Sequence, residues 1–273
     1  MLGELLDNVR RRHPLVHNIT NYVTVNDCAN ILLACGGSPI MADDASEAEE
    51  ITALCAGLNI NIGTLNARTI PAMLAAGKKA NQLGRPVVLD PVGAGASRLR
   101  TDTALGLLDQ VRFAVVRGNI SEIKTLALGS GSTRGVDAGV GDAVTKESLE
   151  EAVRFAKDFA RKTGAVAAIT GAIDIVAGGE RAFCIFNGHP MMSRVTGTGC
   201  QLSAMTAAYV AASPDMPLEA AAAAVCAMGV CGEIAHRRLG ELDGNASYRN
   251  YIIDAAYHLD GETLERCANY EIL

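Results

Sequence analysis

Short apolar runs alternate with longer segments of helical period along most of the chain. Glycine, proline or charged residues bound four of these runs, which predicts that they contain short buried strands. The four runs lie at residues 57–64, 85–95, 113–123 and 164–171. Helices are expected at residues 67–83, 99–109 and 146–163. Repeated strand–helix units predict an α/β fold in which helices cover both faces of a mostly parallel central sheet.

Two segments depart from this alternation. Residues 174–188 are expected to form a hairpin that turns at Gly178 and Gly179. From Gly199 to the end of the chain the pattern is nearly all helical. No segment has the composition of a linker, so we expect a single domain over residues 1–273.

The composition fits this fold and argues against two classes of partner. Hydrophobic residues make up 49% of the chain and charged residues 20%, which is enough to bury a large core. The formal net charge is −6 and the basic residues are scattered, so no nucleic-acid partner is expected. The longest apolar run, between Glu219 and Glu233, is shorter than the roughly 20 residues of a membrane span, so no membrane partner is expected.

The cysteines indicate a reducing environment. None of the eight has C-x-x-C spacing, and no histidine lies close enough to complete a zinc pattern. Most lie in apolar segments and are expected to be reduced and buried. The N-terminal residues also lack the order of a signal peptide. Together these features predict a cytoplasmic protein.

The turn "TGTG" before Cys200 is a candidate anion site. Ligands of open α/β sheets bind beyond the carboxyl ends of the strands, and this turn opens a helix in that region. The backbone of Gly197, Thr198 and Gly199 would form an anion hole at the positive end of the helix. A tight turn that only eases helix packing is the alternative. Cys200 would lie in the first helical turn, as a covalent nucleophile, a general base or an inert buried residue.

Four polar residues at other strand ends are candidates for binding phosphate and metal. Asp90 is placed to organise a metal-bound phosphate, or to cap its own loop. Glu122 would hold Mg²⁺ through water, or Asn119 or Ser121 would simply cap a helix whose dipole favours Glu122 in the first turn. Arg117 would clamp a phosphate, or form a surface ion pair. Carboxylates, an arginine and a glycine-rich anion hole are together the parts that phosphoryl transfer needs.

Several segments resemble the hydroxyethylthiazole kinase family of the ribokinase-like superfamily. The resemblance covers most of the chain, and its most specific parts are residues 14–44 and the turn "TGTGC". The other similar segments are residues 61–66, 87–97, 115–123, 169–176 and 195–204. The resemblance implies a ribokinase-like three-layer fold without a separate lid domain. It also implies transfer of a phosphoryl group from ATP, with Mg²⁺, to 4-methyl-5-(2-hydroxyethyl)thiazole for thiamin biosynthesis.

The resemblance assigns roles to individual residues. It implies that Cys200 faces the substrate hydroxyl, at a position where most ribokinase-like kinases have a catalytic aspartate. The thiazole would be bound by Met41, Gly197, Asn21 and Val23. ATP would be bound by Arg117, Thr170 and Asn119. Mg²⁺ and the phosphates would be organised by Glu122 and Asp90.

The resemblance further implies a homotrimer with active sites between subunits, and residues 128–143 are expected to form a loop near the nucleotide. Other ribokinase-like activities are alternatives, namely phosphorylation of hydroxymethylpyrimidine or pyridoxal and ADP-dependent dehydration of damaged nicotinamide nucleotides. A thiol enzyme that uses Cys200 covalently and a nucleotide sensor without turnover are further alternatives. A dinucleotide-dependent dehydrogenase is disfavoured, because no G-x-G-x-x-G follows the first strand.

Overall fold

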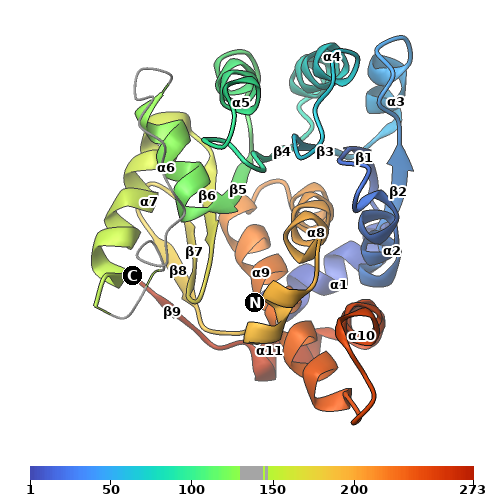
Figure 1. Ribbon diagram of the computed structural model, residues 1–273, viewed down its shortest axis with the longest axis vertical. Coiled ribbons are helices and arrows are strands. Elements are labelled where there is room, and N and C mark those ends of the chain that lie inside the picture. The colour runs from blue at the N-terminus through green and yellow to red at the C-terminus, as the bar shows by residue number, and fades with distance from the viewer. Residues whose placement is uncertain (130–143, 145–146) are drawn as a thin grey trace.

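In the part of the chain that the structure describes, a single sheet of nine strands forms the centre of the protein, shown in Figure 1 as a computed structural model. The structure describes residues 1–129, 144 and 147–273. The strand order is β2-β1-β3-β4-β5-β6-β7-β8-β9. The strands are β1 Leu15–Ile19, β2 Ser38–Met41, β3 Gly57–Asn61, β4 Val87–Asp90, β5 Val115–Asn119, β6 Val166–Thr170, β7 Asp174–Ala177, β8 Ala182–Ile185 and β9 Tyr270–Ile272.

The first six strands of the chain pair in parallel, and the last three are antiparallel to their neighbours. The parallel register places Asn61 opposite Asp90 and Asn119 opposite Thr170. Polar residues that end different strands therefore meet at one edge of the sheet.

Helices cover both faces of the sheet, so the predicted three-layer α/β architecture is confirmed (Figure 1). One face carries α1 Leu2–Arg12, α2 Val25–Cys35, α8 Thr198–Ala212, α9 Pro217–Arg238, α10 Asn245–His258 and α11 Gly261–Cys267. The other carries α3 Ala48–Leu54, α4 Thr69–Gln82, α5 Arg98–Gln110, α6 Ile120–Leu128 and α7 Leu149–Thr163. Each face has its own apolar core, because alternate strand residues such as Val88 and Leu89 point to opposite sides.

The four predicted strands and the predicted hairpin are confirmed, but elements at both ends of the chain were not predicted. The unit β1–α2–β2 was not predicted, although it supplies one edge of the sheet. The last segment was expected to be helical, yet β9 pairs with β8, Phe183 opposite Ile272. Three residues are too few to show a strand period. Most of the loop expected at residues 128–143 lies outside the described residues.

Helix α9 is the one helix in the described part of the chain that is long and apolar enough to cross a membrane. Within that helix, 78% of the apolar window is buried inside the protein. It packs against α8, α10 and α1. Packing in the core therefore accounts for its apolar composition.

Two glycine-to-alanine substitutions should change stability in opposite directions. A Cβ atom at Gly229 of α9 would lie 2.6 Å from the Cβ atom and 2.9 Å from the carbonyl carbon of Asn187. Gly229→Ala should therefore lower the free energy of unfolding by about 1–3 kcal/mol. Gly106→Ala in α5 meets nothing within 4 Å and should raise it by about 0.5–1 kcal/mol. Urea unfolding of both variants measures this, and equal stabilisation would contradict the close contact at Gly229.

Candidate active site

The N-terminus of α8 is built around a glycine that no other residue can replace without strain. Gly197 has φ +95° in the left-handed region, and a Cβ atom there would lie 2.5 Å from Cγ2 of Thr24. The first hydrogen bond within the helix runs from the Gln201 N–H to the Gly197 carbonyl, 2.8 Å. The N–H groups of Thr198 and Gly199 precede it, so they have no partner within the helix. The predicted anion hole therefore coincides with a helix N-terminus.

Arg117 brings a positive charge to the same place. It lies in β5, and a Cβ atom on Gly199 would be 2.6 Å from its Nη1 atom, so the guanidinium lies against the start of α8. Its Nη2 atom donates to Oγ1 of Thr170, 2.6 Å, and its Nη1 atom lies 3.5 Å from Oδ1 of Asp90. The Arg117 side chain is only 12% exposed. The ion pair is therefore an internal one, not the surface pair considered from the sequence.

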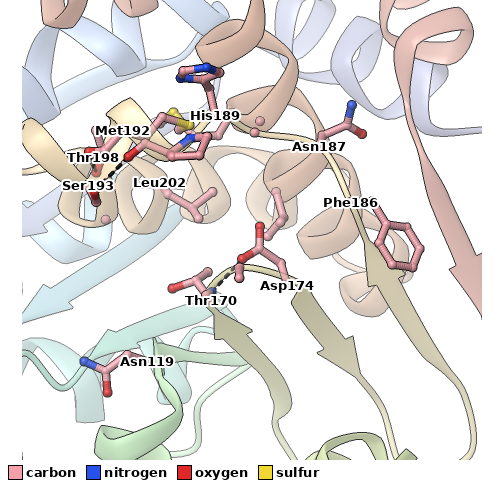
Figure 2. Close-up of a pocket in the computed structure, with 18 of the residues that line it drawn as sticks. Asn119, Thr170, Asp174, Phe186, Asn187, His189, Met192, Ser193, Thr198 and Leu202 are labelled. Carbon is pink, nitrogen blue, oxygen red and sulfur yellow. Dashed lines mark hydrogen bonds between the residues drawn. The ribbon is translucent and has the colours of Figure 1, made fainter. Parts of the chain in front are cut away.

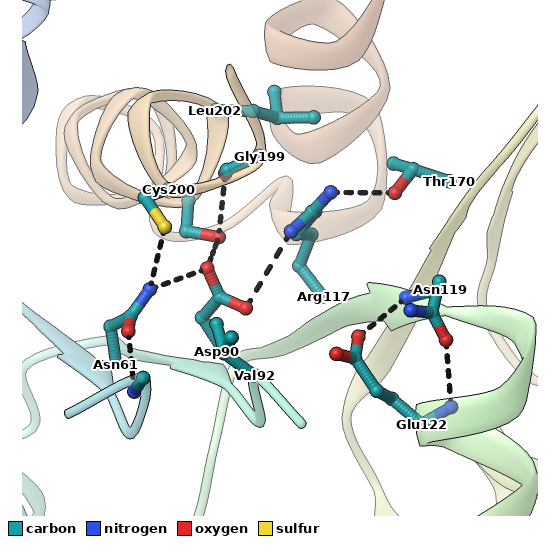
Figure 3. Close-up of polar contacts among 12 residues, drawn as sticks. Asn61, Asp90, Val92, Arg117, Asn119, Glu122, Thr170, Gly199, Cys200 and Leu202 are labelled. Atoms are coloured by element: carbon teal, nitrogen blue, oxygen red, sulfur yellow. Dashed lines mark hydrogen bonds and ion pairs between the residues drawn. The ribbon is translucent and has the colours of Figure 1, made fainter. Parts of the chain in front are cut away.

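Asp90 is a fully buried carboxylate at the end of β4 (Figure 3). Its Oδ2 atom accepts hydrogen bonds from Nδ2 of Asn61, 2.8 Å, and from Oγ of Ser203, 2.7 Å. Burial raises the pKa of Asp90, and the Arg117 guanidinium and the hydrogen bonds offset part of that rise. The partners of Asp90 come from β3, β5 and α8, so the carboxylate joins these elements and does not cap its own loop.

Cys200 sits above the ends of β1 and β3. Its Sγ atom accepts hydrogen bonds from Nδ2 of Asn21, 3.2 Å, and Nδ2 of Asn61, 3.3 Å. Asn21 is held in turn by Thr24, whose N–H and hydroxyl both donate to its Oδ1 atom, 3.1 and 3.0 Å. His189, the nearest histidine in sequence, stacks on His236 at 3.5 Å between ring centroids.

Asn119 caps α6, as one alternative from the sequence proposed, and Glu122 completes the cap. The Asn119 Oδ1 atom accepts from the Glu122 N–H, and the Asn119 N–H donates to Oε2 of Glu122, both at 2.8 Å. The other carboxylate oxygen, Oε1, accepts from the Gly93 N–H, 2.8 Å. Burial raises the pKa of Glu122, while the Gly93 hydrogen bond lowers it. Glu122 thus joins the loop after β4 to the start of α6.

A cavity of about 750 Å³ opens beside the start of α8 (Figure 2). Its polar end is lined by Arg117, Asn119 and Thr170, and its apolar part by Leu202, Val225 and Met228. Thr198 and Gly199 also line it. This volume is in the range of small-molecule sites, and the positive end beside a helix N-terminus suits an anionic group.

The predicted residues divide along the strand order. Met41 ends β2 and Asn21 follows β1, so both lie at the β2–β1 side, together with exposed Val23. The three residues predicted to bind ATP line the cavity at the other side, near β5 and β6. Cys200 and Asp90 lie between the two groups. The candidate residues thus follow one another along the strand order, with the N-terminus of α8 at the middle.

Three polar residues at this site were not identified from the sequence. They are Asn61, Ser203 and Asp174. Asn61 carried a signal, because Asn59 and Asn61 fall at alternate positions of a buried strand and so share a face. Ser203 lies one helical turn after Gly199, but only the packing of α8 on β4 brings it to Asp90.

Asp174 lines the cavity at the start of β7, and its Oδ1 atom accepts from the Gly171 N–H, 2.8 Å. Burial raises its pKa from 3.8 to about 6, while the Gly171 hydrogen bond and Arg117 lower it. Between pH 3.8 and about pH 6, the Asp174 carboxyl is protonated in the folded protein and ionised in the unfolded chain. The contribution of Asp174 to stability is therefore lost as pH rises through this window.

Asp174→Asn should remove this pH dependence, because an amide keeps the acceptor for Gly171 and cannot ionise. Relative to the unsubstituted protein, the variant should gain about 1–2 kcal/mol in free energy of unfolding between pH 4.5 and pH 7.5. Urea unfolding at both pH values measures the difference. A difference that stays constant with pH would show that burial does not perturb this carboxyl.

Comparison with known proteins places the chain in a family. The model of the hydroxyethylthiazole kinase family matches residues 6–262. A hydroxyethylthiazole kinase from Clostridium acetobutylicum is 65% identical over 99% of both chains. The solved structure of the Pyrococcus horikoshii hydroxyethylthiazole kinase protein has a TM-score of 0.88 and 38% identity, covering 100% of this chain and 98% of that one.

A more distant likeness concerns the fold alone. The Staphylococcus aureus pyridoxal kinase in complex with AMP-PCP and pyridoxal has a TM-score of 0.60 at 13% identity, covering 95% of this chain and 97% of that one. The match to the family model and the 65% identical relative confirm the resemblance of the sequence to this kinase family. The chain is a kinase with a ribokinase-like fold, and it belongs to the hydroxyethylthiazole kinase family.

Proposed function

We propose that the chain transfers the γ-phosphoryl group of ATP to the hydroxyl of 4-methyl-5-(2-hydroxyethyl)thiazole, and so supplies thiazole phosphate for thiamin biosynthesis. One structural observation, beyond the family membership, supports this reaction. In the first turn of α8, Gly199 lines a cavity with a cationic end, and the next residue, Cys200, directs its sulfur to the Asn61 amide. A phosphoryl group held at that helix end would have a nucleotide on one side and an acceptor hydroxyl on the other.

The cavity is the proposed nucleotide site. Arg117 and Thr170 would bind the phosphates, with Arg117 already oriented by its bonds to Thr170 and Asp90. Asn119 would contribute from the wall of the same cavity. The N–H groups of Thr198 and Gly199 would stabilise the charge that develops during transfer, since they need no reorientation.

The acceptor alcohol is proposed to lie on the Asn21 side of α8. Met41, Val23 and Asn21 would contact the thiazole, with the Gly197 backbone closing the site toward the phosphates. Cys200 would act as general base. In that step its Sγ atom, as the thiolate, takes the hydroxyl proton, and the freed oxygen bonds to the γ-phosphorus as the bond to ADP breaks. Phosphoryl transfer asks little of a base, because positioning and charge neutralisation supply most of the acceleration.

The residues present fit a water-bound Mg²⁺ ion better than a cage of protein ligands. The described residues contain no group of three or more histidine, cysteine or acidic side chains that could together hold a metal ion. Asp90 is fully buried and faces Arg117. Glu122 is partly exposed, and each of its oxygens accepts one N–H, which leaves lone pairs for water. Mg²⁺ keeps several waters, so Glu122 would hold it through them, and the ion would neutralise phosphate charge.

A homotrimer with the site between subunits is part of the proposal. Tyr22 is 77% exposed and Val23 is 59% exposed, directly after buried Asn21. Large apolar side chains beside a binding site are typical of a surface that a partner covers. A cytoplasmic location is also proposed, supported by eight free cysteines.

The substrate assignment is tested by measuring ADP release from ATP with three alcohols. The hydroxyethylthiazole should support turnover, whereas hydroxymethylpyrimidine and pyridoxal should not, and EDTA should abolish the reaction. Release with another alcohol alone would keep the kinase chemistry and overturn the proposed substrate. Activity that persists in EDTA would overturn the proposed Mg²⁺ requirement.

The role of Cys200 is tested by three substitutions at that position. Cys200→Asp should keep or raise turnover, because a carboxylate also accepts the hydroxyl proton. Cys200→Ser and Cys200→Ala should lower kcat, by about 10²-fold or more for alanine, with ATP binding nearly intact. Steady-state kinetics and ATP titration measure both quantities. Full turnover by Cys200→Ala would contradict the general-base role of Cys200 and would show that the glycine-rich turn is sufficient for catalysis.

A further inference from the structure

We propose that Asn61 is a positioning residue that fixes the Cys200 sulfur relative to the Asp90 carboxylate. The proposal rests on the proposed function, in which Cys200 takes the proton of the acceptor hydroxyl. Asn61 ends β3, is 1% exposed and joins both groups through one amide nitrogen (Figure 3). Its Nδ2 atom donates to Asp90 Oδ2, 2.8 Å, and to Cys200 Sγ, 3.3 Å.

The orientation of this amide is set by the backbone. The Asn61 Oδ1 atom accepts from the Gly63 N–H, 2.9 Å, and from Nδ2 of Asn21, 3.0 Å. Rotating the amide by half a turn would place its NH₂ group against the Gly63 N–H and its oxygen against the Asp90 carboxylate. Both contacts would be repulsive, so the donor side must face Cys200 and Asp90.

The two amides determine from which direction the sulfur can receive a proton. Asn21 and Asn61 both donate to Sγ, and an amide nitrogen cannot accept a proton in return. A deprotonated sulfur has three lone pairs, and the amides occupy two of them. The third is left for the substrate proton. The O–H bond breaks, the S–H bond forms, and the oxygen bonds to phosphorus as ADP leaves.

Loss of the Asn61 side chain should disturb Cys200 more than Asp90. Asp90 would keep the hydroxyl of Ser203 and the guanidinium of Arg117. Among the described residues, Cys200 would keep only Asn21, whose own amide loses its Asn61 acceptor. The sulfur would then be free to leave its place, while the carboxylate stays where it is.

Asn61→Ala tests the proposal, with Asn59→Ala as the matched control. Asn59 lies two residues earlier on the same face of β3, is fully buried, and donates from Nδ2 to Asn18 Oδ1, 3.1 Å. Both variants should lower the midpoint of thermal unfolding. Only Asn61→Ala should lower kcat, by roughly 10- to 100-fold, with the KM for ATP changed less than about threefold. An equal fall in kcat for both variants, or none for Asn61→Ala, overturns the proposal.

A double-mutant cycle separates an effect through Cys200 from one through Asp90. Adding Asn61→Ala to Cys200→Ala should lower the rate by less than about threefold, because the group being positioned is already gone. Single-turnover transfer from γ-labelled ATP extends the measurement to slow variants. If Asn61→Ala lowers the rate by the same factor with and without Cys200→Ala, the positioning role is overturned and the Cys200 assignment stays intact. Full turnover by Cys200→Ala instead overturns the proposed function on which the role depends.

Asn61→Asp covers the case in which Asn61→Ala does not fold. Aspartate has the same shape and keeps the acceptor for Gly63 and Asn21. Beside buried Asp90 the new carboxyl would bind one proton, which joins the two carboxyl groups and leaves Cys200 without this donor. We expect a similar loss of kcat with a folded protein, verified by its thermal transition. A fully active Asn61→Asp would show that donation to the sulfur is not needed and would overturn the proposal.

Discussion

The buried charge pair between Asp90 and Arg117 is the interaction on which the site depends. A carboxylate with no exposed surface is destabilising unless its oxygens are paired and hydrogen-bonded. Here the partners come from β3, β5 and α8, so three elements must be in place together. Satisfying one charge therefore also places the start of α8, the Cys200 thiol and the wall of the cavity.

Close backbone approach is the second constraint. Gly197 and Gly199 lack side chains where Thr24 and the Arg117 guanidinium would otherwise collide with them. This lets the positive end of α8 and the guanidinium lie side by side, which would be unfavourable without an anion nearby. The arrangement fits a protein that handles phosphate groups, and the two glycines are what permit it.

Much of the fold follows from local pattern, and some of the site does not. Apolar runs in the sequence predict the strands at 57–61 and 166–170, and closely spaced glycines predict the turn before Cys200. The short strand β9 carries no such pattern, because its pairing with β8 decides its conformation. Asn61 and Ser203 look like ordinary polar residues until packing brings them to Asp90.

The sequence by itself determined the α/β class, the family and the residues at the strand ends, because periodicity and local motifs depend on residues that are close together in the sequence. Only the tertiary structure decided which of these residues touch. It placed Cys200 against two asparagine amides, divided the site about the start of α8, and made Arg117 an internal partner of Asp90. Such contacts join residues from 27 to 179 positions apart, a separation over which local pattern carries no signal.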